Sequence, residues 1–417
     1  MISPSLSAET LSHAVQEALS SHPDLLSSKA QLRGSEADLS AAKGVYLPTL
    51  DLTYAKGNET TDSPATRLAT GGEVDLDRKE AGLVLRQNLF DVSRFNEVDR
   101  AEAARDSSRQ GAEATEEKVR FNVIKNFLSV NSNRLIVEVA KSSLAAHEKI
   151  SAMVSQRSES GAGSQTDTRQ AESRLAMARV NYLQYQTLMK NSEYEYLTAV
   201  GQPPELEMID DLTLPVNDLV DMDYAVSEAV RNHPQIKKAQ YDLDVARQEQ
   251  DAIRGRYYPT VGIEARLNKN ENIDGAAGIY DEHSVMLRVN YNLFNGGSDW
   301  SRSSSRAAKV NEMQERLEMT RRQISEAVRK AWTSREITTE RLKYLTEQAE
   351  KTETVRNDYQ MQFVLGKRSL LNLLDLEKEL LEARRDKIRA EYDRRMADVT
   401  LLYAMGRLKS SATGRTL

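Results

Sequence analysis

Residues 257–268 read Tyr-Tyr-Pro-Thr-Val-Gly-Ile-Glu-Ala-Arg-Leu-Asn, and from Val261 onward apolar and polar side chains alternate. Successive side chains of a strand point to opposite faces, so this segment would have one apolar and one polar face. Residues 285–293 repeat the alternation, with Val, Leu, Val, Tyr and Leu at every second position. The two segments therefore predict an antiparallel pair of strands.

The same hairpin is predicted a second time, because the chain is an internal duplication. Five short motifs of the first half recur in the same order in the second half, at offsets of 204 to 211 residues. They are His22-Pro23 and His233-Pro234, Tyr46–Leu50 and Tyr257–Val261, Asn88–Phe90 and Asn292–Phe294, Gly161 and Gly366, and Ala199–Gly201 and Ala404–Gly406. Ordered matches of this kind indicate a two-fold repeat.

Long helices are predicted where prolines are missing. None of the nine prolines lies between Pro64 and Pro203 or after Pro259. Because proline costs a helix interior about 3 kcal/mol, long proline-free tracts are what extended helices need. A helix over residues 93–157 would be on the order of 95 Å long at ~1.5 Å per residue, and a second is expected over residues 298–361.

Each repeat is thus expected to hold two short helices, a β-hairpin and a long helical hairpin. Residues 58–79 and 269–282 have neither a helical nor a strand period and are expected to form polar loops. The expected segments are 1–45 and 222–256 for the short paired helices, 46–90 and 257–294 for the strands, 91–201 and 295–406 for the long helical hairpins, 202–221 for a linker and 407–417 for a tail.

Composition narrows the class of protein. Apolar residues make up 39% and charged residues 29% of the 417 residues, which suits long helices with narrow buried seams better than one thick core. The net charge of −6 argues against a nucleic-acid partner. The absence of cysteine excludes disulfides, thiolate metal sites and a lipid-bearing cysteine. The first ten residues resemble no signal peptide, so either a cytoplasmic protein or a mature chain is expected.

The strands suggest a membrane location. Four alternating strands of about 9–11 residues have the length that a tilted strand needs to cross a bilayer. Four strands cannot close a barrel, and an open edge is not tolerated in lipid, so several chains would have to share one barrel. A soluble four-stranded sheet packed on a helix is the alternative. Aromatic residues near the strand ends predict a membrane girdle: Tyr46, Phe90, Tyr257, Tyr258 and Phe294.

The chain resembles the TolC family of bacterial outer-membrane channels from about residue 6 to residue 408. The resemblance rests on the duplication, the His-Pro junctions, the Tyr-x-Pro-Thr strand starts, the Asn-Leu-Phe strand ends, and the sequence Gly-Lys-Arg-Ser-Leu-Leu-Asn-Leu-Leu-Asp at 366–375. It implies a mainly α-helical homotrimer, in which four strands per protomer complete a 12-stranded membrane β-barrel and duplicated helical hairpins form a periplasmic α-barrel. The partners it implies are a periplasmic adaptor and an inner-membrane transporter, with a signal peptide removed from the mature chain.

The resemblance also assigns roles to the turns of the helical hairpins, which are otherwise simple helix–helix turns. It implies a pore constriction at Asp375 and Asn372, although a solvated helix charge is the alternative for Asp375. It implies a gate latch of Arg368 with Asp167, Thr166 and Phe363, in which Phe363 stands where related channels have Tyr. The tips that would contact the adaptor are Gly161, Ala162, Gly163, Val364, Leu365, Gly366 and Lys367.

An enzyme is not expected, because catalytic motifs are missing and the five histidines are scattered. No cofactor or metal is expected, and the acidic pair Asp210-Asp211 is interpreted as solvated. The predicted function is the outer-membrane duct of type I secretion of an unfolded protein, such as a large adhesin, with an ABC transporter. The lack of cysteine favours this use over the alternative, multidrug efflux. A soluble coiled-coil scaffold is the alternative from another class.

Overall fold

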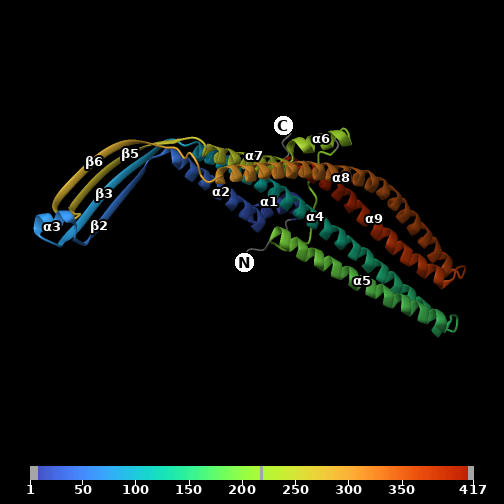
Figure 1. Ribbon diagram of the computed structural model, residues 1–417. Coiled ribbons are helices and arrows are strands. Elements are labelled where there is room, and N and C mark those ends of the chain that lie inside the picture. Colours follow the sequence, from blue (N-terminus) through green and yellow to red (C-terminus); the bar gives the residue numbers. More distant parts are fainter. Residues whose placement is uncertain (1–7, 217–218, 412–417) are drawn as a thin grey trace. The chain divides into compact units, whose positions relative to one another are not determined.

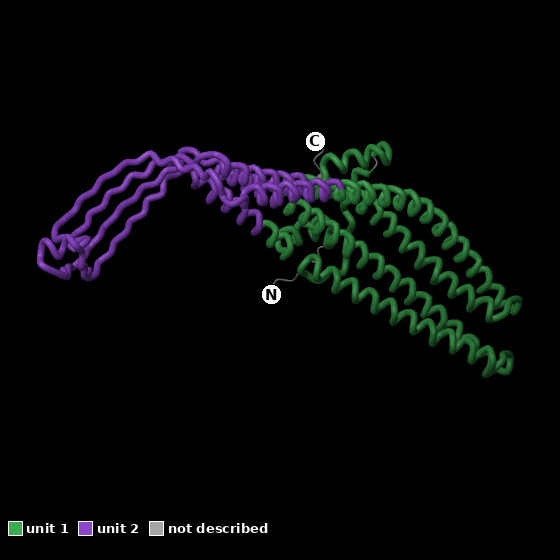
Figure 2. The backbone as a smooth tube through the Cα atoms, viewed as in Figure 1, with its two compact units in different colours: residues 1–29, 110–237, 319–417 green, residues 30–109, 238–318 purple. Residues whose placement is uncertain are grey.

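The computed structural model describes residues 8–216 and 219–411. The start of the predicted 1–45 segment, two residues of the predicted linker and most of the predicted 407–417 tail lie outside this range. The chain forms two compact units (Figure 2), one made of residues 1–29, 110–237 and 319–417 and the other of residues 30–109 and 238–318. Each unit therefore combines segments of both repeats.

The helices follow the duplication. The first repeat contains α1 (Leu11–Ser21), α2 (Pro23–Lys43), α4 (Val92–Glu159) and α5 (Gln165–Val200), and the second contains α6 (Met222–Asn232), α7 (Pro234–Gly255), α8 (Ser298–Val364) and α9 (Leu370–Ala404). Short helices η1 (Gly44–Tyr46), α3 (Pro64–Thr70) and α10 (Leu408–Ser411) complete the set described. Since α4 has 68 residues and α8 has 67, the two predicted long helices are confirmed. No helix in the described ranges is long and apolar enough to cross a membrane.

The His-Pro junctions are also confirmed. His22 and His233 cap the C-termini of α1 and α6, and their backbone N–H groups donate to Ala18 and Ala229. The following proline opens the next helix, where its missing N–H costs no hydrogen bond.

The strands form one antiparallel sheet in the order β2-β3-β5-β6, seen side by side in Figure 1. Their bounds are β2 (Thr49–Thr61), β3 (Val74–Phe90), β5 (Thr260–Ile273) and β6 (Ala276–Asn290). Pairing of β3 with β5 joins the two repeats, so β2 and β6 are the sheet edges. A separate parallel pair, β1 (Glu9–Thr10) with β4 (Met208–Ile209), ties the start of the described chain to the linker.

The register produces the predicted apolar face. Leu52 lies opposite Leu83, and Leu83 lies opposite Leu267, so apolar side chains run across the strands. This face is uncovered, because Leu52 and Val285 are each 76% exposed. Along β5 it extends over about seven residues, which is about 23 Å at ~3.3 Å per residue. That is close to the ~25 Å apolar band of an outer-membrane barrel.

The prediction of polar loops at 58–79 and 269–282 is wrong. The strands take up ten of the 22 residues 58–79, with α3 between them, and nearly all of residues 269–282. A tight turn joins β5 and β6, and in it Asp274 and Gly275 have positive φ. Beyond the apolar band both faces are polar, so no alternation signals a strand there. Backbone pairing and cross-strand ion pairs, such as Lys79 with Glu271 at 2.9 Å, stabilise this part instead.

The two repeats differ where each long hairpin returns to the short helices. Gly201 and Gly406 are equivalent, and both have positive φ. A Cβ at Gly406 would lie 2.7 Å from Cδ of Pro234, whereas one at Gly201 would lie 3.8 Å from Oγ of Ser21. His233 is buried in the tighter junction, and burial lowers its pKa to about 4.

This difference makes Gly201→Ala a matched control for Gly406→Ala. Both variants strain a left-handed backbone position, but Gly406→Ala also forces a clash, which typically costs about 1–3 kcal/mol. We expect Gly406→Ala to lower the unfolding temperature of the purified protein clearly more than Gly201→Ala, as measured by circular dichroism. Equal decreases would contradict the close packing at Pro234.

Candidate functional site

The two helical hairpins turn in the same way. Gly161 follows α4 and Gly366 follows α8, both with positive φ, as glycine readily adopts after a helix. Ser164 and Ser369 then cap α5 and α9 by accepting the backbone N–H of Thr166 and Asn372. The predicted adaptor-contact residues of both turns are exposed: Gly161, Ala162, Gly163, Val364, Leu365, Gly366 and Lys367.

An apolar cluster just behind the turns packs all four long helices together. Its buried members are Ile150, Val154, Ala171, Phe363, Leu370, Leu373 and Leu374. Phe363 is only 7% exposed, so the structure places it in this core and not in a polar contact with Arg368 or Asp167. A phenyl ring has no hydrogen-bonding group and is stabilised by burial, so Phe363 offers no hydroxyl to the predicted latch, and its role there stays a prediction.

The predicted latch residues do not meet within one chain. Arg368 donates through Nε to Gln362 at 2.9 Å, and its guanidinium lies 4.3 Å from the ring centroid of Tyr359. In the part of the chain that the structure describes, no ion pair joins Arg368 to Asp167. Asp167 and Thr166 lie in the first turn of α5. A latch between neighbouring chains stays a prediction.

Two other arginines join the hairpins of one chain. Arg174 of α5 binds Asp375 of α9, with Nη2 2.7 Å from Oδ1. Arg157 of α4 donates to the backbone oxygen of Val364 at 3.2 Å, and its guanidinium lies 5.1 Å from the ring centroid of Phe363. The carboxylate predicted to line the constriction is therefore paired inside its own chain.

Asn372, the other predicted constriction residue, takes part in the cap of α9. The hydroxyl of Ser369 donates to Oδ1 of Asn372 at 2.6 Å, and the backbone N–H of Asn372 donates to Oγ of Ser369. Asn372 and Asp375 are one helical turn apart and both are exposed. Their exposure is compatible with a constriction, which stays a prediction.

Sequence reasoning missed Arg174, although the duplication contained a signal for it. At the repeat offset of 205, Arg174 aligns with Glu379, which is one helical turn beyond Asp375. Arg174 of α5 and Asp375 of α9 lie within about one helical turn of equivalent positions along the two helices. Their opposite charges can therefore meet if α5 and α9 are adjacent. That adjacency came only with the structure.

A buried histidine lies behind the Arg174–Asp375 pair. His147 of α4 is 6% exposed, and its Nδ1 has no hydrogen-bond partner among the described residues. It lines a cavity of about 20 Å³ with Ser143, Arg174, Leu374 and Lys378. Burial and, secondarily, the positive charge of Arg174 lower its pKa.

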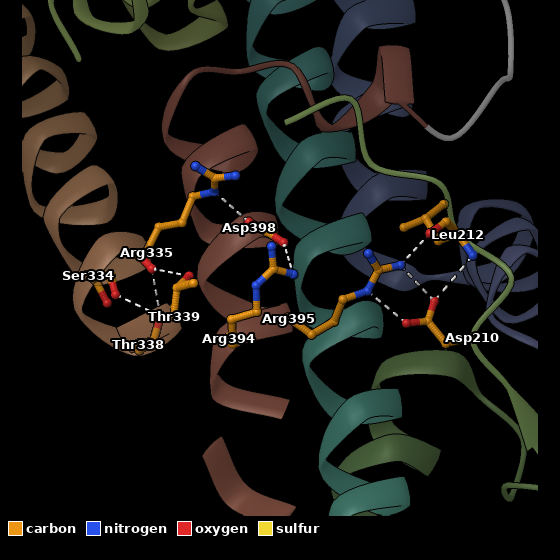
Figure 3. A network of polar contacts seen from close by, with 9 residues as sticks. All are labelled: Asp210, Leu212, Ser334, Arg335, Thr338, Thr339, Arg394, Arg395 and Asp398. Carbon is orange, nitrogen blue, oxygen red and sulfur yellow. Dashed lines mark hydrogen bonds and ion pairs between the residues drawn. The ribbon is translucent and has the colours of Figure 1, made fainter. Parts of the chain in front are cut away.

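The linker between the repeats is anchored by Arg395, as Figure 3 shows. Arg395 binds both carboxylate oxygens of Asp210, at 2.8 and 3.1 Å, and also the backbone oxygen of Leu212. Asp211 accepts the backbone N–H of Ser12 at 2.9 Å. Asp210 and Asp211 are both exposed, as expected of a solvated pair, but each carboxylate also accepts a specific donor.

A second set of contacts in Figure 3 joins α8 to α9. Asp398 is 1% exposed and binds Arg335 at 2.7 Å and Arg394 at 2.8 Å (Figure 3). Two guanidinium groups offset the cost of burying this carboxylate. No group of three or more His, Asp or Glu side chains in the described ranges could hold a metal ion.

The five predicted girdle residues lie at one end of the four-stranded sheet. They precede β2 and β5, end β3 or follow β6, and their exposed fractions range from 40% to 83%. Tyr46 stacks on Phe95 with centroids 5.4 Å apart. The set is Tyr46, Phe90, Tyr257, Tyr258 and Phe294. Aromatic rings at one level, three of them with the polar hydroxyl of tyrosine, suit a membrane–water interface.

A family model described as outer membrane efflux protein matches residues 14–202 and 225–407. The chain belongs to the outer membrane efflux protein family. The two matched segments correspond to the two repeats, and residues 203–224 between them contain the linker. Membership confirms the resemblance found in the sequence and places the protein in the outer membrane, in a family of channel and transport proteins.

One relative named for efflux and one named for secretion match 98% and 84% of this chain. Outer membrane efflux protein BepC of Brucella suis is 24% identical over 98% of this chain and 87% of BepC. Alkaline protease secretion protein AprF of Pseudomonas aeruginosa is 21% identical over 84% of this chain and 75% of AprF. This member of the efflux family is thus an outer-membrane channel of the type found in efflux and secretion systems.

Solved structures confirm the fold. The outer-membrane channel OprN has a TM-score of 0.84 at 20% identity, covering 95% of this chain and 89% of OprN. The CmeC outer membrane channel of Campylobacter jejuni has a TM-score of 0.85 at 14% identity, covering 99% and 91%.

The buried His147 makes the hairpin ends sensitive to acid. The fold favours neutral His147, so this stabilisation is complete above the ordinary pKa of about 6.5 and is lost as the pH falls below it. The charged groups nearest to it are Arg174 on α5 and Lys378 on α9, with Asp375 beyond Arg174, so a proton on His147 adds to a positive site.

We therefore expect the unfolding temperature to fall more between pH 7 and pH 5 in the wild type than in His147→Gln. Each 1 kcal/mol of this stabilisation corresponds to about 1 °C in a chain of 417 residues, at ~2.1 cal/mol/K per residue. Circular dichroism in detergent measures the difference. Identical pH dependence in the two proteins would contradict the assignment.

Proposed function

We propose that three copies of this chain close one 12-stranded β-barrel in the outer membrane and that their long helices form a periplasmic duct. The four-stranded sheet carries this proposal, because its apolar face is uncovered and its edges β2 and β6 each pair on one side only among the described strands. Unpaired backbone groups at a sheet edge are not tolerated in lipid. Since spanning barrels begin at about eight strands, chains must share one.

Strand number favours three chains over two. Two chains would give an eight-stranded barrel, whose interior is filled by its own side chains. Three chains give a 12-stranded barrel, which is the next size that four-stranded units can build. Because barrel diameter grows with strand number, this barrel is wide enough for a lumen. The resemblance to the TolC family implies the same homotrimer.

We further propose that the duct receives its substrate from an inner-membrane ABC transporter through a periplasmic adaptor, which docks on the exposed hairpin tips. The name of the alkaline protease secretion protein AprF supports export of a polypeptide. Our candidate is an unfolded polypeptide such as a large adhesin. The name of BepC supports the second candidate, multidrug efflux.

Deletion of the gene in the native host separates these two uses. If the duct serves type I secretion, we expect a polypeptide to disappear from the culture medium while susceptibility to toxic compounds is unchanged. Proteomics of the medium and growth inhibition assays measure the two effects. Increased susceptibility with an unchanged set of secreted proteins would contradict secretion and support efflux.

The contacts between hairpins suggest how the duct is held closed. Arg174–Asp375 and Arg157–Val364 each join the first hairpin of a chain to the second, so opening by separation of the hairpins would break them. Arg368 and Asp167 would add a latch between chains. Each contact is partly exposed, so it is easily broken and remade.

Conductance of the purified protein in a planar lipid bilayer tests this gate. An exposed ion pair contributes about 0.2–1 kcal/mol, so Arg174→Gln should raise the open-to-closed ratio about 1.4- to 5-fold per chain. Arg368→Ser should also raise it. Arg179→Gln is the matched control, because Arg179 lies on the same helix and pairs with Glu148 at 4.0 Å within one hairpin. Unchanged conductance in Arg174→Gln would contradict a gating role for the pair.

A further inference from the structure

The polar face of the strands carries a compact group of arginines, which we call the arginine belt: Arg86 on β3, Arg266 on β5 and Arg288 on β6. All three bind Glu264 of β5. Its Oε2 accepts from Nε of Arg86 at 3.1 Å, and its Oε1 accepts from Nη2 of Arg266 at 2.7 Å and of Arg288 at 2.8 Å. One carboxylate thus gathers three guanidinium groups from three adjacent strands.

The strand register explains why these groups meet. Arg86 lies directly opposite Glu264, and Arg288 lies opposite Gly262, two residues from Glu264 along β5. Arg266 is two residues from Glu264 on the other side, so all four side chains share one face. Glycine at 262 leaves space beside the longer side chains.

The carboxylate and the guanidinium groups of this cluster differ in exposure. Glu264 is 8% exposed, whereas the side chains of Arg86 and Arg288 are 50% and 53% exposed and that of Arg266 is 37% exposed. The negative charge is therefore covered, and the positive charges face outward from the sheet. The side chains are too exposed for the arrangement to be explained as a buried ion pair.

The negative charge in this group does not balance the positive charge. Asp51 of β2 adds one carboxylate, 2.8 Å from Nη1 of Arg86. Within the belt, three arginines and two carboxylates leave one net positive charge per chain. Farther along the strands the same face also carries Arg78, Glu59, Glu80 and Glu282. The excess of positive charge is therefore local to the belt. Among the described contacts, Arg266 and Arg288 each use one nitrogen, so most of their donors remain directed at solvent.

We propose that the arginine belt makes the barrel lumen selective for anions and that it is a specificity-determining element of the channel. The inference rests on the proposed function, because the polar face becomes a lumen only when the barrel closes. Three-fold symmetry then repeats the belt around the wall and gives a ring of positive charge. Such a ring raises the local concentration of anions and admits chloride or carboxylate-bearing solutes ahead of cations.

Opening of the duct would free Asp375 from Arg174, so the predicted constriction adds a negative charge of its own to the conducting channel. The contribution of the belt is therefore measured as the difference between variants that share the same constriction.

The test is the reversal potential of the full-length channel in a planar bilayer under a KCl gradient. The salt concentration is kept at or below about 0.1 M, where the Debye length is ~10 Å or more and charges on the wall still act on passing ions. Arg266→Gln/Arg288→Gln should lower the chloride-to-potassium permeability ratio at least about twofold. Glu264→Gln should raise it, since it leaves the arginines in place. Lys269→Gln is the matched control, because Lys269 is an exposed cation of the same strand on the opposite face, and its ratio should equal that of the wild type.

All variants have the same hairpin ends, so differences between their permeability ratios do not contain the contribution of the hairpin ends. A conducting double variant with the wild-type ratio would overturn the belt while leaving the channel intact. A wild-type protein that forms no channel would instead overturn the proposed function, and the belt with it. If the double variant fails to insert, Arg266→Gln and Arg288→Gln are measured singly. Each should shift the ratio in the same direction by a smaller factor, and no shift in either would overturn the proposal.

Discussion

The unpaired backbone groups along β2 and β6 are the constraint on which the rest of the structure depends. Water satisfies such groups, whereas lipid does not. The same sheet has an uncovered apolar face that favours lipid over water. Only neighbouring chains that complete the sheet satisfy both conditions. The duplication follows from this requirement, because each repeat supplies a hairpin and the β3–β5 pairing joins the two hairpins into one unit.

The two repeats are equivalent in fold but not in contacts, and the differences lie where movement or specificity is needed. His233 is buried against Gly406, whereas its counterpart His22 is only half-buried. The second strand pair supplies Glu264, Arg266 and Arg288, while the first supplies Arg86 and Asp51. At the hairpin ends, Arg157 and Arg174 of the first repeat bind the second. The two repeats therefore share one scaffold but carry different chemistry on each half.

The sequence alone predicted the elements that depend on local rules. Proline-free tracts located α4 and α8, and alternation located the apolar part of the strands. It failed where a strand has two polar faces, as in residues 269–282, because no periodicity marks such a strand. It also missed Arg174, Arg395 and the burial of Phe363. These contacts depend on which helices are adjacent and how they are rotated, and periodicity within one helix does not contain that information.

Disulfide cross-linking between chains tests the shared barrel most directly, and the chain has no cysteine to interfere. Within one chain β2 and β6 are separated by two strands, about 14 Å at ~4.8 Å per strand, which is beyond the ~7 Å limit for a disulfide. One cysteine would replace Thr53, and a second would be placed in turn at each of residues 284–290. The account predicts covalent trimers in outer membranes at one register. Monomers at every register, or products that end at the dimer, would contradict it.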